Sequence, residues 1–322
     1  MRLKTVLAAC LAGIAAISAL PAAAQSYPTR NIKFIVPFQA GSATDALARI
    51  VGEHVGRSLG RAVIVENMAG ASGVVAAQNV ARAEPDGHTV LISTNTTHGA
   101  NQSLLKSVPY DAVNGFEHVT KLGTITLALI ANPSVPANDV RELIAYAKAN
   151  PGKLTFGSGS SSSRIAGEML KSLGDIDIVH VPYRSNPQAI TDILGGQINL
   201  FFADISTTLP QVKAGKVKGF AVSTAQRSKL APDLPTMIEA GVPNYDLAAW
   251  FAAFVPAKTP KPVVDKLREA LVAAVNDPAT QEKLLAAGIE PETSTSEELK
   301  AFVAAEIKKW AEIVKAAGIQ PE

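Results

Sequence analysis

Short apolar runs alternate with longer stretches of helical periodicity along most of this chain. Residues 32–38 are almost wholly apolar and predict a buried strand, and apolar side chains at helical spacing from Leu47 to Leu59 predict the helix that follows. A second strand over 62–66 and a helix over 74–80 repeat this order. Strand and helix in alternation are typical of a parallel sheet covered on both faces.

The alternation continues with a strand over 89–93 and with apolar strands around Val119 and over 127–130. A second set of elements follows, with predicted helices over 140–148, 165–173, 189–194 and 205–214 and predicted strands over 154–156, 176–181, 198–202 and 217–223. Two successive α/β units predict two lobes, which fits a chain above the usual size of a single core.

Three helical stretches, over 263–276, 281–287 and 297–317, follow a last strand around 250–255. Helices without intervening strands do not make a third α/β unit, so we expect them to return and cover the first lobe. The predicted boundaries are 25–125 for the first part of lobe 1, 126–248 for lobe 2 and 249–322 for the return to lobe 1. Several crossings between lobes are typical of proteins that hinge around a central cleft.

The first 24 residues have the pattern of a secretory signal peptide. Two basic residues precede an apolar run over 6–20, which is too short for a permanent membrane helix. The small residues of the segment 22–24 predict cleavage before Gln25. We therefore expect an exported chain that does not span the membrane after cleavage. A lipoprotein cleavage site at Cys10 is the alternative reading.

Composition after cleavage excludes several classes of protein. Removal of 24 of the 322 residues leaves 298 without a cysteine, so these can form no disulfide and hold no cysteine-bound metal. The leader holds two of the 30 Lys and Arg and none of the 28 Asp and Glu, so the remaining charges balance. A neutral chain argues against a nucleic acid or an anionic membrane as a partner.

Three loops at the carboxyl ends of predicted strands, over 39–45, 94–98 and 157–163, consist mainly of Gly, Ser, Thr, Asn and Gln. Ligands of α/β sheets bind at such ends, where free N–H groups, hydroxyls and helix dipoles favour an anion. The three loops together predict a site for a carboxylate or another small anion. Helix capping by the same Ser and Thr side chains is the alternative for each loop.

Charged and aromatic residues stand next to these loops. Arg164 falls in the first turn of a predicted helix, where a cation opposes the dipole at a cost on the order of 0.3–1 kcal/mol that a bound anion would offset. A solvated Arg164 is the alternative. Tyr183, Arg184 and Ser185 follow a strand and can reach the same cleft. Asp204 ends another strand, and it either bonds the ligand or caps the next helix.

The sequence contains no arrangement typical of catalysis or of a cofactor site. There is no nucleophile elbow, no phosphate-binding loop and no histidine pair at metal-binding spacing, so we expect no enzyme, no cofactor and no metal. His98, in a polar loop, is the only histidine that we place near a ligand. The alternative from another class is a secreted α/β hydrolase using Ser158 or Ser160, against which the sequence places no base beside either serine.

Short motifs follow one another in a fixed order over nearly the whole chain after the leader. In the first half they are Tyr27-Pro28, Ile35-Val36-Pro37-Phe38, Gly41, Asp45, Val65-Glu66-Asn67, Gly70, Gly73, Pro85-Asp86-Gly87, Val108-Pro109-Tyr110-Asp111 and Asn132-Pro133-Ser134-Val135-Pro136. In the second half they are Val179-His180-Val181-Pro182-Tyr183, Thr191-Asp192-Ile193-Leu194-Gly195-Gly196-Gln197, Leu234-Pro235-Thr236, Trp250-Phe251 and Pro256-Ala257-Lys258-Thr259-Pro260. This ordered set resembles the Bug-type receptors, the solute-binding proteins of tripartite tricarboxylate transporters.

The resemblance implies a periplasmic two-lobed α/β protein of Venus flytrap architecture, with a ligand cleft between the lobes and no chemistry of its own. It implies capture of a carboxylated solute for a membrane permease, and a sensor that docks on a membrane kinase is the alternative. In the family, the loop after the first strand holds a ligand carboxylate through main-chain amides and waters, which matches residues 38–45. The opposite lobe supplies loops matching 157–164 and 183–186, with Asp204 near the cleft.

This chain departs from the family at positions that bear on the ligand. Ser42, Arg164 and the pair Arg184-Ser185 stand where the family usually has Gly, His and Lys-Gly. The added hydroxyl and guanidinium groups predict a dicarboxylate or an aromatic carboxylate, with Phe38 and Trp250 as apolar walls. The full set of candidate ligand-binding residues is Phe38, Gln39, Ala40, Gly41, Ser42, Thr44, Asp45, Thr94, Asn95, His98, Ser158, Ser160, Ser161, Ser162, Arg164, Tyr183, Arg184, Ser185, Asp204 and Trp250.

Overall fold

The computed structural model describes residues 27–316 and 318–321. The predicted signal peptide (1–24), its cleavage site before Gln25 and Cys10 lie outside the described residues. The strands are β1 (Ile32–Val36), β2 (Val63–Asn67), β3 (Thr89–Thr94), β4 (Phe116–Ala131), β5 (Thr155–Ser158), β6 (Val179–Pro182), β7 (Leu200–Asp204), β8 (Lys218–Val222), β9 (Ala248–Pro256) and β10 (Glu290–Pro291). The helices are α2 (Ala43–Leu59), α3 (Val74–Ala81), α4 (Asn101–Leu104), α5 (Val140–Ala149), α6 (Ser161–Gly174), α7 (Asn186–Leu194), α8 (Ile205–Lys213), α9 (Lys261–Asn276), α10 (Pro278–Ala286) and α11 (Ser296–Ala316), with a 3-10 turn η1 (Ala71–Gly73) and a π-helical turn η2 (Thr96–Ala100).

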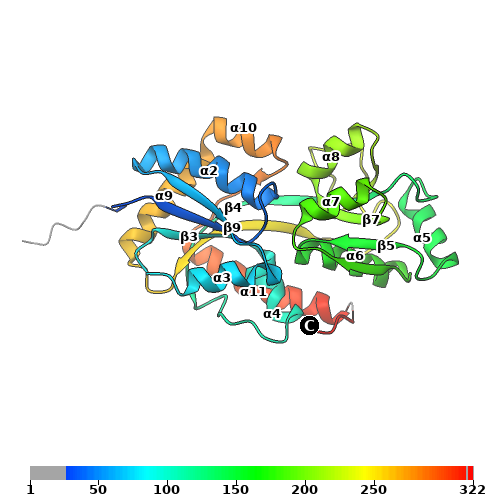
Figure 1. Cartoon of the computed structure of the whole chain (residues 1–322), viewed down its shortest axis with the longest axis horizontal. Coiled ribbons are helices and arrows are strands. Elements are labelled where there is room, and N and C mark those ends of the chain that lie inside the picture. The colour runs from blue at the N-terminus through cyan, green and yellow to red at the C-terminus, as the bar shows by residue number, and fades with distance from the viewer. Residues whose placement is uncertain (1–26, 317, 322) are drawn as a thin grey trace, which may run out of the picture.

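The strands form one mixed sheet in the order β2-β1-β3-β9-β4-β7-β5-β6, with β8 and β10 paired to β4. β1 is parallel to β2 and β3, and β5 is parallel to β6 and β7, whereas β4 and β9 run antiparallel to their neighbours. The α/β fold with two lobes agrees with the sequence pattern (Figure 1). The expectation of a parallel sheet is wrong at its centre, because β4 and β9 pair antiparallel with each other and with their other neighbours.

β4 is a single strand of 16 residues where the sequence predicted two short apolar strands. Its first part pairs with β9 from Phe116 to Thr126. In the second lobe, Leu127–Ala131 pairs with β7 and Ala128–Ala131 pairs with β8. The pairing with β9 shifts register at two places, between His118 and Thr120 and between Lys121 and Gly123. These irregular, partly polar positions interrupt the apolar run, which explains why the sequence pattern predicted two strands.

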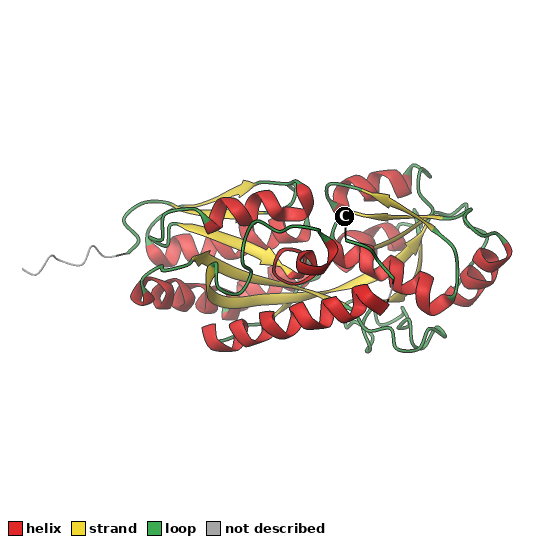
Figure 2. Cartoon of the chain, turned by 90° about the horizontal axis from the view of Figure 1, so that it is seen from below, coloured by secondary structure: helices red, strands yellow, loops and turns green. Residues whose placement is uncertain are grey.

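Each lobe has a core of its own. In the first lobe, side chains such as Phe34, Leu47 and Leu271 pack α2 and α9, which contact each other, against one face of the sheet. In the second lobe, buried residues that include Phe156 and Phe202 pack β5 and β7 against α5 and α6. The strands that connect the two cores run from one half of the molecule to the other in the view from below (Figure 2). None of the described helices is long and apolar enough to cross a bilayer.

The C-terminal helices only partly follow the expectation that they cover the first lobe. α9 and α10 pack on α2 of that lobe, as predicted. α11 reaches both lobes, because Leu299 and Val303 lie in a cluster with residues of β3 and β9, whereas Trp310 and Val314 belong to the core of the second lobe. α11 is therefore a third connection between the lobes, which the amphipathic pattern alone did not reveal.

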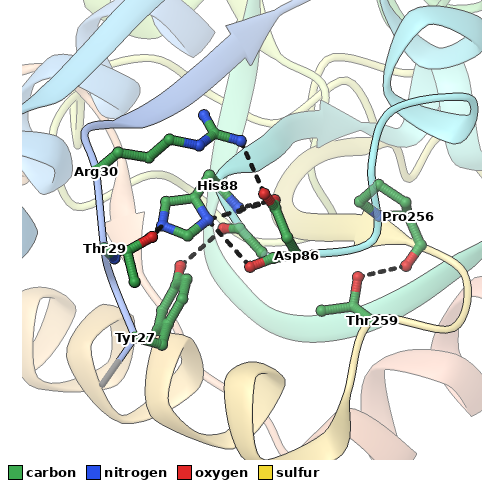
Figure 3. Close-up of polar contacts among 8 residues, drawn as sticks. Tyr27, Thr29, Arg30, Asp86, His88, Pro256 and Thr259 are labelled. Atoms are coloured by element: carbon green, nitrogen blue, oxygen red, sulfur yellow. Dashed lines mark hydrogen bonds and ion pairs between the residues drawn. The ribbon is translucent and has the colours of Figure 1, made fainter. Parts of the chain in front are cut away.

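Hydrogen bonds and an ion pair join the first described residues to the turn that precedes β3 (Figure 3). The Tyr27 hydroxyl donates to the Gly87 carbonyl at 2.7 Å, and the Thr29 backbone N–H donates to Nε2 of His88 at 3.1 Å. The Arg30 guanidinium pairs with Asp86 at 2.8 Å. The turn thus fixes the start of β1 beside β3, at the end of the lobe away from the cleft.

We predict that Gly87→Ala destabilises the fold by about 2–4 kcal/mol, because the substitution adds left-handed strain and a steric clash. Gly87 has a φ of +79°, and a Cβ there would lie 2.3 Å from Cγ1 of Val263 and 3.0 Å from the Tyr27 ring. Gly215→Ala is the matched control, since its φ is +68° with nothing within 4 Å of the added Cβ. That control should cost about 1 kcal/mol. Urea unfolding of both variants measures the difference, and equal losses of stability would contradict the packing argument.

Candidate ligand-binding cleft

A cavity between the lobes holds about 340 Å³ of empty space, part of it open to solvent. Apart from two residues of β9, its walls come from the carboxyl ends of strands, the loops after them and the first turns of the helices that follow. The lining residues are Phe38, Ser42, Ala43, Thr44, Thr94, Asn95, Thr96, Gly159, Ser160, Ser162, Ser185, Asn186, Asp204, Ala249 and Phe251. We call this space the first cavity.

Four helices begin at the first cavity. Their N-cap residues are Ser42 for α2, Ser160 for α6, Ser185 for α7 and Asp204 for α8, and all four line the cavity. The start of a helix carries partial positive charge and free N–H groups, which favour an anion. The convergence of four such starts favours an anion in the first cavity, although its described lining residues include no cationic side chain.

Helix capping, the alternative weighed for each polar loop, accounts for two of the N-cap serines. Ser42 Oγ accepts from the N–H of Asp45 at 3.2 Å. Ser160 and Ser163 form a reciprocal capping box, in which each side chain accepts from the backbone N–H of the other. These bonds hold the first turns of α2 and α6 in place, so capping and the shaping of the cavity are compatible roles.

Two other polar atoms at the first cavity have no such role. Ser185 Oγ makes no capping bond, and neither Ser185 Oγ nor Asn95 Oδ1 has a hydrogen-bond partner among the described residues. Both residues are fully buried. A buried polar atom without a hydrogen-bond partner lowers the stability of the fold by about 1–3 kcal/mol. A polar ligand group that bonds either atom would remove this cost.

Asp204 is the only ionisable residue among those that line the first cavity. Burial raises the pKa of its carboxyl to about 6, although a hydrogen bond from Asn186 Nδ2 at 3.1 Å acts in the opposite direction. Its side chain makes no capping bond to α8. Asp204 is therefore mostly ionised at neutral pH in the empty cleft, and a carboxylate ligand beside it would favour the protonated form.

Asp45, a predicted contact, lies behind the cavity wall rather than in its lining. Its carboxylate accepts from the Gly41 N–H at 3.0 Å, from Arg49 and from Asn67. Burial opposes ionisation of Asp45, but these hydrogen bonds outweigh it and lower the pKa of the carboxyl. Asn67 also donates to the Phe38 carbonyl at 2.9 Å. Asp45 thus organises the loop over 38–45, and its charge is compensated there.

Hydrogen bonds join the two lobes at the first cavity. Asn95 Nδ2 donates to Ser162 Oγ at 2.8 Å, and the Ser161 N–H donates to Thr96 Oγ1 at 3.2 Å. Asn95 and Thr96 follow β3 of the first lobe, whereas the two serines begin α6 of the second. The predicted loops over 94–98 and 157–163 therefore meet across the cleft.

Several predicted residues line a neighbouring space, which we call the second cavity. Ser158, Ser161, Arg164, Tyr183 and Arg184 line it together with Ala71, Ser72, Leu104, Leu105, His180 and Pro182, and Gly159 and Ser160 border both cavities. We expected Tyr183, Arg184 and Ser185 to reach one cleft, but only Ser185 lines the first cavity. The β6–α7 turn places neighbouring residues in the walls of different cavities, which the sequence did not reveal.

Trp250 does not form the predicted apolar wall. It is 2% exposed, packs against Phe302 and donates from Nε1 to Glu306 at 2.8 Å. Side chains alternate between the faces of a strand, so the neighbouring Phe251 lines the first cavity instead, as Phe38 does. The sequence contained this pair, but it gave no means of choosing which ring faces the cleft.

His98 and part of the first loop also lie outside the cavity lining. His98 is fully buried, stacks on Phe254 at 3.9 Å between ring centroids and bonds Ser93 Oγ through Nδ1 at 2.7 Å. Burial lowers the pKa of its imidazole well below the usual value. Gln39, Ala40 and Gly41 do not line the cavity either, and the last two are exposed. The sequence reasoning missed Ala43, Thr96, Gly159, Asn186, Ala249 and Phe251, which sit one or two positions from predicted residues.

The structure also places a base beside Ser158, where the sequence showed none. Nε2 of His180 lies 2.6 Å from Ser158 Oγ, because β5 and β6 are parallel neighbours. No Asp or Glu is among the residues that line this second cavity. Among the described residues, no group of three or more His, Cys, Asp and Glu could hold a metal ion.

Known proteins share this architecture over most of the chain. Residues 47–319 match the family described as the tripartite tricarboxylate transporter family receptor. Protein BugT of Bordetella pertussis is 32% identical over 310 residues, which cover 95% of this chain and 94% of that protein. The periplasmic binding protein BugD has 35% identity and a TM-score of 0.88, covering 92% of this chain and 100% of its own.

Two further similar structures contain carboxylate ligands. R. palustris Rpa4515 with adipate has 32% identity and a TM-score of 0.89, covering 92% of this chain and 100% of its own. MatC from Rhodopseudomonas palustris with bound malate has 30% identity and a TM-score of 0.85, covering 89% and 100%. The fold and the cleft define a two-lobed solute-binding protein of the periplasmic type. The chain belongs to the tripartite tricarboxylate transporter receptor family, whose Bug-type members are solute-binding receptors and not enzymes.

We predict that Asp204→Asn stabilises the unliganded protein at neutral pH by up to about 3 kcal/mol. The folded-state pKa of about 6 lies above the ordinary value of 3.8, so the wild-type carboxyl loses stability as the pH rises between these values. The gain should therefore be near zero at about pH 4 and complete above about pH 6. Urea unfolding across this range measures it, with Asp233→Asn as a control at an exposed position. A gain that does not change with pH would contradict the assignment.

Proposed function

We propose that this protein is a periplasmic receptor that captures a small carboxylate between its lobes and delivers it to a membrane permease. The observation that carries the proposal is the convergence of four helix N-termini on one interlobe cavity. We further infer that the signal peptide is removed before Gln25, so that the mature chain is released into the periplasm.

The chemistry of the first cavity supports a carboxylate. Its donors are backbone N–H groups and the hydroxyls of Thr44, Ser162 and Ser185, which suit the oxygens of a carboxylate group. The fixed dipoles make the charge of the ligand favourable without a salt bridge. If the charge of the bound ligand raises the pKa of Asp204 further, the protonated carboxyl adds one more donor. The similar structures with adipate and with malate support this ligand class.

The apolar part of the first cavity supports a ligand with a hydrocarbon or aromatic body. Phe38 and Phe251 line it together with Ala43 and Ala249. Burial of apolar ligand surface against these side chains contributes about 25 cal/mol for each Å². A dicarboxylate chain or an aromatic carboxylate satisfies both the polar and the apolar walls, which is the ligand class that we propose.

Closure of the lobes supports capture rather than surface adsorption. The Asn95–Ser162 and Ser161–Thr96 hydrogen bonds join the two lobes across the cleft. Opening must break them, and a ligand that contacts both lobes shifts the equilibrium toward the closed form. A permease can then distinguish the loaded receptor from the empty one by its shape.

A thermal-unfolding screen of the chain from Gln25 tests the ligand class. We expect adipate, malate or benzoate to raise the melting temperature by about 5 °C at a concentration near one hundred times Kd. Adipamide has the same length as adipate but no charge, so it should give no shift. Equal shifts with adipamide and adipate, or no shift with any acid, would refute a carboxylate receptor.

Ser185→Ala separates ligand contact from folding. Because Ser185 Oγ has no partner among the described residues, its removal should leave the unliganded stability unchanged or slightly raised. Carboxylate affinity should fall about tenfold, since a hydrogen bond to a charged group is lost. Ser206→Ala is the matched control, because its buried hydroxyl also has no described partner but does not line the cavity. Calorimetry showing equal affinity losses in both variants would contradict the assigned contact.

A further inference from the structure

Glu306 of α11 is a buried carboxylate that belongs to neither cavity. It is 7% exposed and is not among the residues that line the first or the second cavity. Its Oε2 accepts the indole N–H of Trp250 at 2.8 Å and the indole N–H of Trp310 at 3.0 Å. These two are the only tryptophans of the sequence. One carboxylate oxygen therefore holds both indoles.

The two indoles belong to different halves of the molecule. Trp250, on β9, lies in the cluster that joins β3 and β9 of the first lobe to Leu299 and Val303 of α11. Trp310 lies in the core of the second lobe. Glu306 stands between these two parts of α11 along the chain. Its carboxylate thus bonds both indoles at the place where the helix passes from one lobe to the other.

Trp250 lies directly behind one wall of the first cavity. Its neighbours Ala249 and Phe251 line that cavity, and strand alternation turns Trp250 to the opposite face of β9. On that face its ring packs against Phe302 of α11, with 5.3 Å between the ring centroids. The hydrogen bond to Glu306 therefore fixes the strand segment that supplies two residues of the cavity wall.

Trp310 lies behind another part of the same cleft. A Cβ on Gly99 of η2 would lie 3.1 Å from Cδ1 of Trp310, so the indole is in close contact with this turn. The turn begins at Thr96, which lines the first cavity and accepts the N–H of Ser161 from the second lobe. Glu306 thus joins the support of the β9 wall to the support of the η2 wall.

The hydrogen bonds of Glu306 make this joint stiff. Bonds that a carboxylate accepts are shorter and stronger than those between neutral groups, and a buried N–H that loses its acceptor is costly. Trp250 and Trp310 are 2% and 1% exposed, so water does not replace Glu306 as their acceptor. Lys309 Nζ lies 3.8 Å from the other oxygen, Oε1, and leaves Oε2 to the indoles.

We propose that Glu306 is a positioning residue for ligand capture, which fixes the cleft walls and the angle between the lobes by holding both indoles on α11. The inference rests on the proposed function, since it names a further residue on which the affinity of the same cleft depends. Without the joint, the lobes of the empty protein sample more orientations. Only a fraction of these bind the ligand, so the apparent affinity falls.

Distances between spin labels on the two lobes test the joint without any ligand. The chain from Gln25 has no cysteine, so Ala145→Cys on α5 and Lys266→Cys on α9, both at exposed positions, give one labelling site in each lobe. Electron double resonance should show a narrow distance distribution for this labelled chain and a broader one when Glu306→Leu is added. Glu306→Gln keeps an oxygen that can accept from both indoles, so it should keep the narrow distribution.

Calorimetry with adipate tests the effect on capture. Glu306→Leu should lower the affinity at least about fivefold in protein that circular dichroism shows to be folded. Trp250→Phe removes one indole N–H and keeps an apolar ring, so it should lower the affinity by less. Glu306→Gln should bind as the unaltered chain does. Tyr27→Phe is the matched control, because it also removes a ring donor, but at the end of the lobe away from the cleft, and should leave the affinity unchanged.

The outcomes separate this proposal from the proposed function. A folded Glu306→Leu variant with either the label distances or the adipate affinity of the unaltered chain would overturn the positioning role. An equal loss of affinity in Tyr27→Phe would also overturn it, because affinity would then follow stability alone. If Glu306→Leu does not fold, the same two measurements on Trp250→Phe decide. If the unaltered chain binds no acid, the carboxylate receptor is refuted, and the label distances alone decide whether Glu306 fixes the lobes.

Discussion

The antiparallel pairing of β4 with β9 is the constraint on which the rest of the structure depends. β4 pairs with β9 as far as Thr126, with β7 from Leu127 and with β8 from Ala128, so both lobes are built on one strand. This ladder orients the carboxyl ends of β1, β3, β5, β6 and β7 toward one gap. Rotation of one lobe against the other must bend β4 where it changes partners. α11 also connects the lobes, because its residues lie in clusters of both, with Trp310 in the core of the second.

The same polar loops serve folding and recognition. Helix caps satisfy one or two of the first four N–H groups of a helix and leave the others available. Ser42 and Ser160 cap their helices, while Ser185 and Asp204 at the same cavity make no capping bond. A cleft built in this way attracts an anion through fixed dipoles, and the loop holding Asp45 stays ordered because its charge is compensated by its neighbours.

Local patterns predicted the α/β fold and the polar loops because strand ends, caps and helical periods are short-range features. Pairing between distant segments was not predictable in the same way. The polar positions inside β4 hid its continuity, and one residue of strand alternation decided that Phe251 rather than Trp250 faces the cleft. The burial of His98 among aromatic rings and the approach of His180 to Ser158 likewise arise from packing between elements.

A crystal structure of the chain from Gln25 with adipate tests the central claim most directly, that a carboxylate is held between the lobes by helix N-termini. The account predicts one ligand carboxylate within hydrogen-bond distance of Ser185 Oγ and of N–H groups in the first turns of α2 and α6, with no lysine or arginine in contact with it. A ligand bound outside the first cavity, or a carboxylate in that cavity held by cationic side chains, would contradict it.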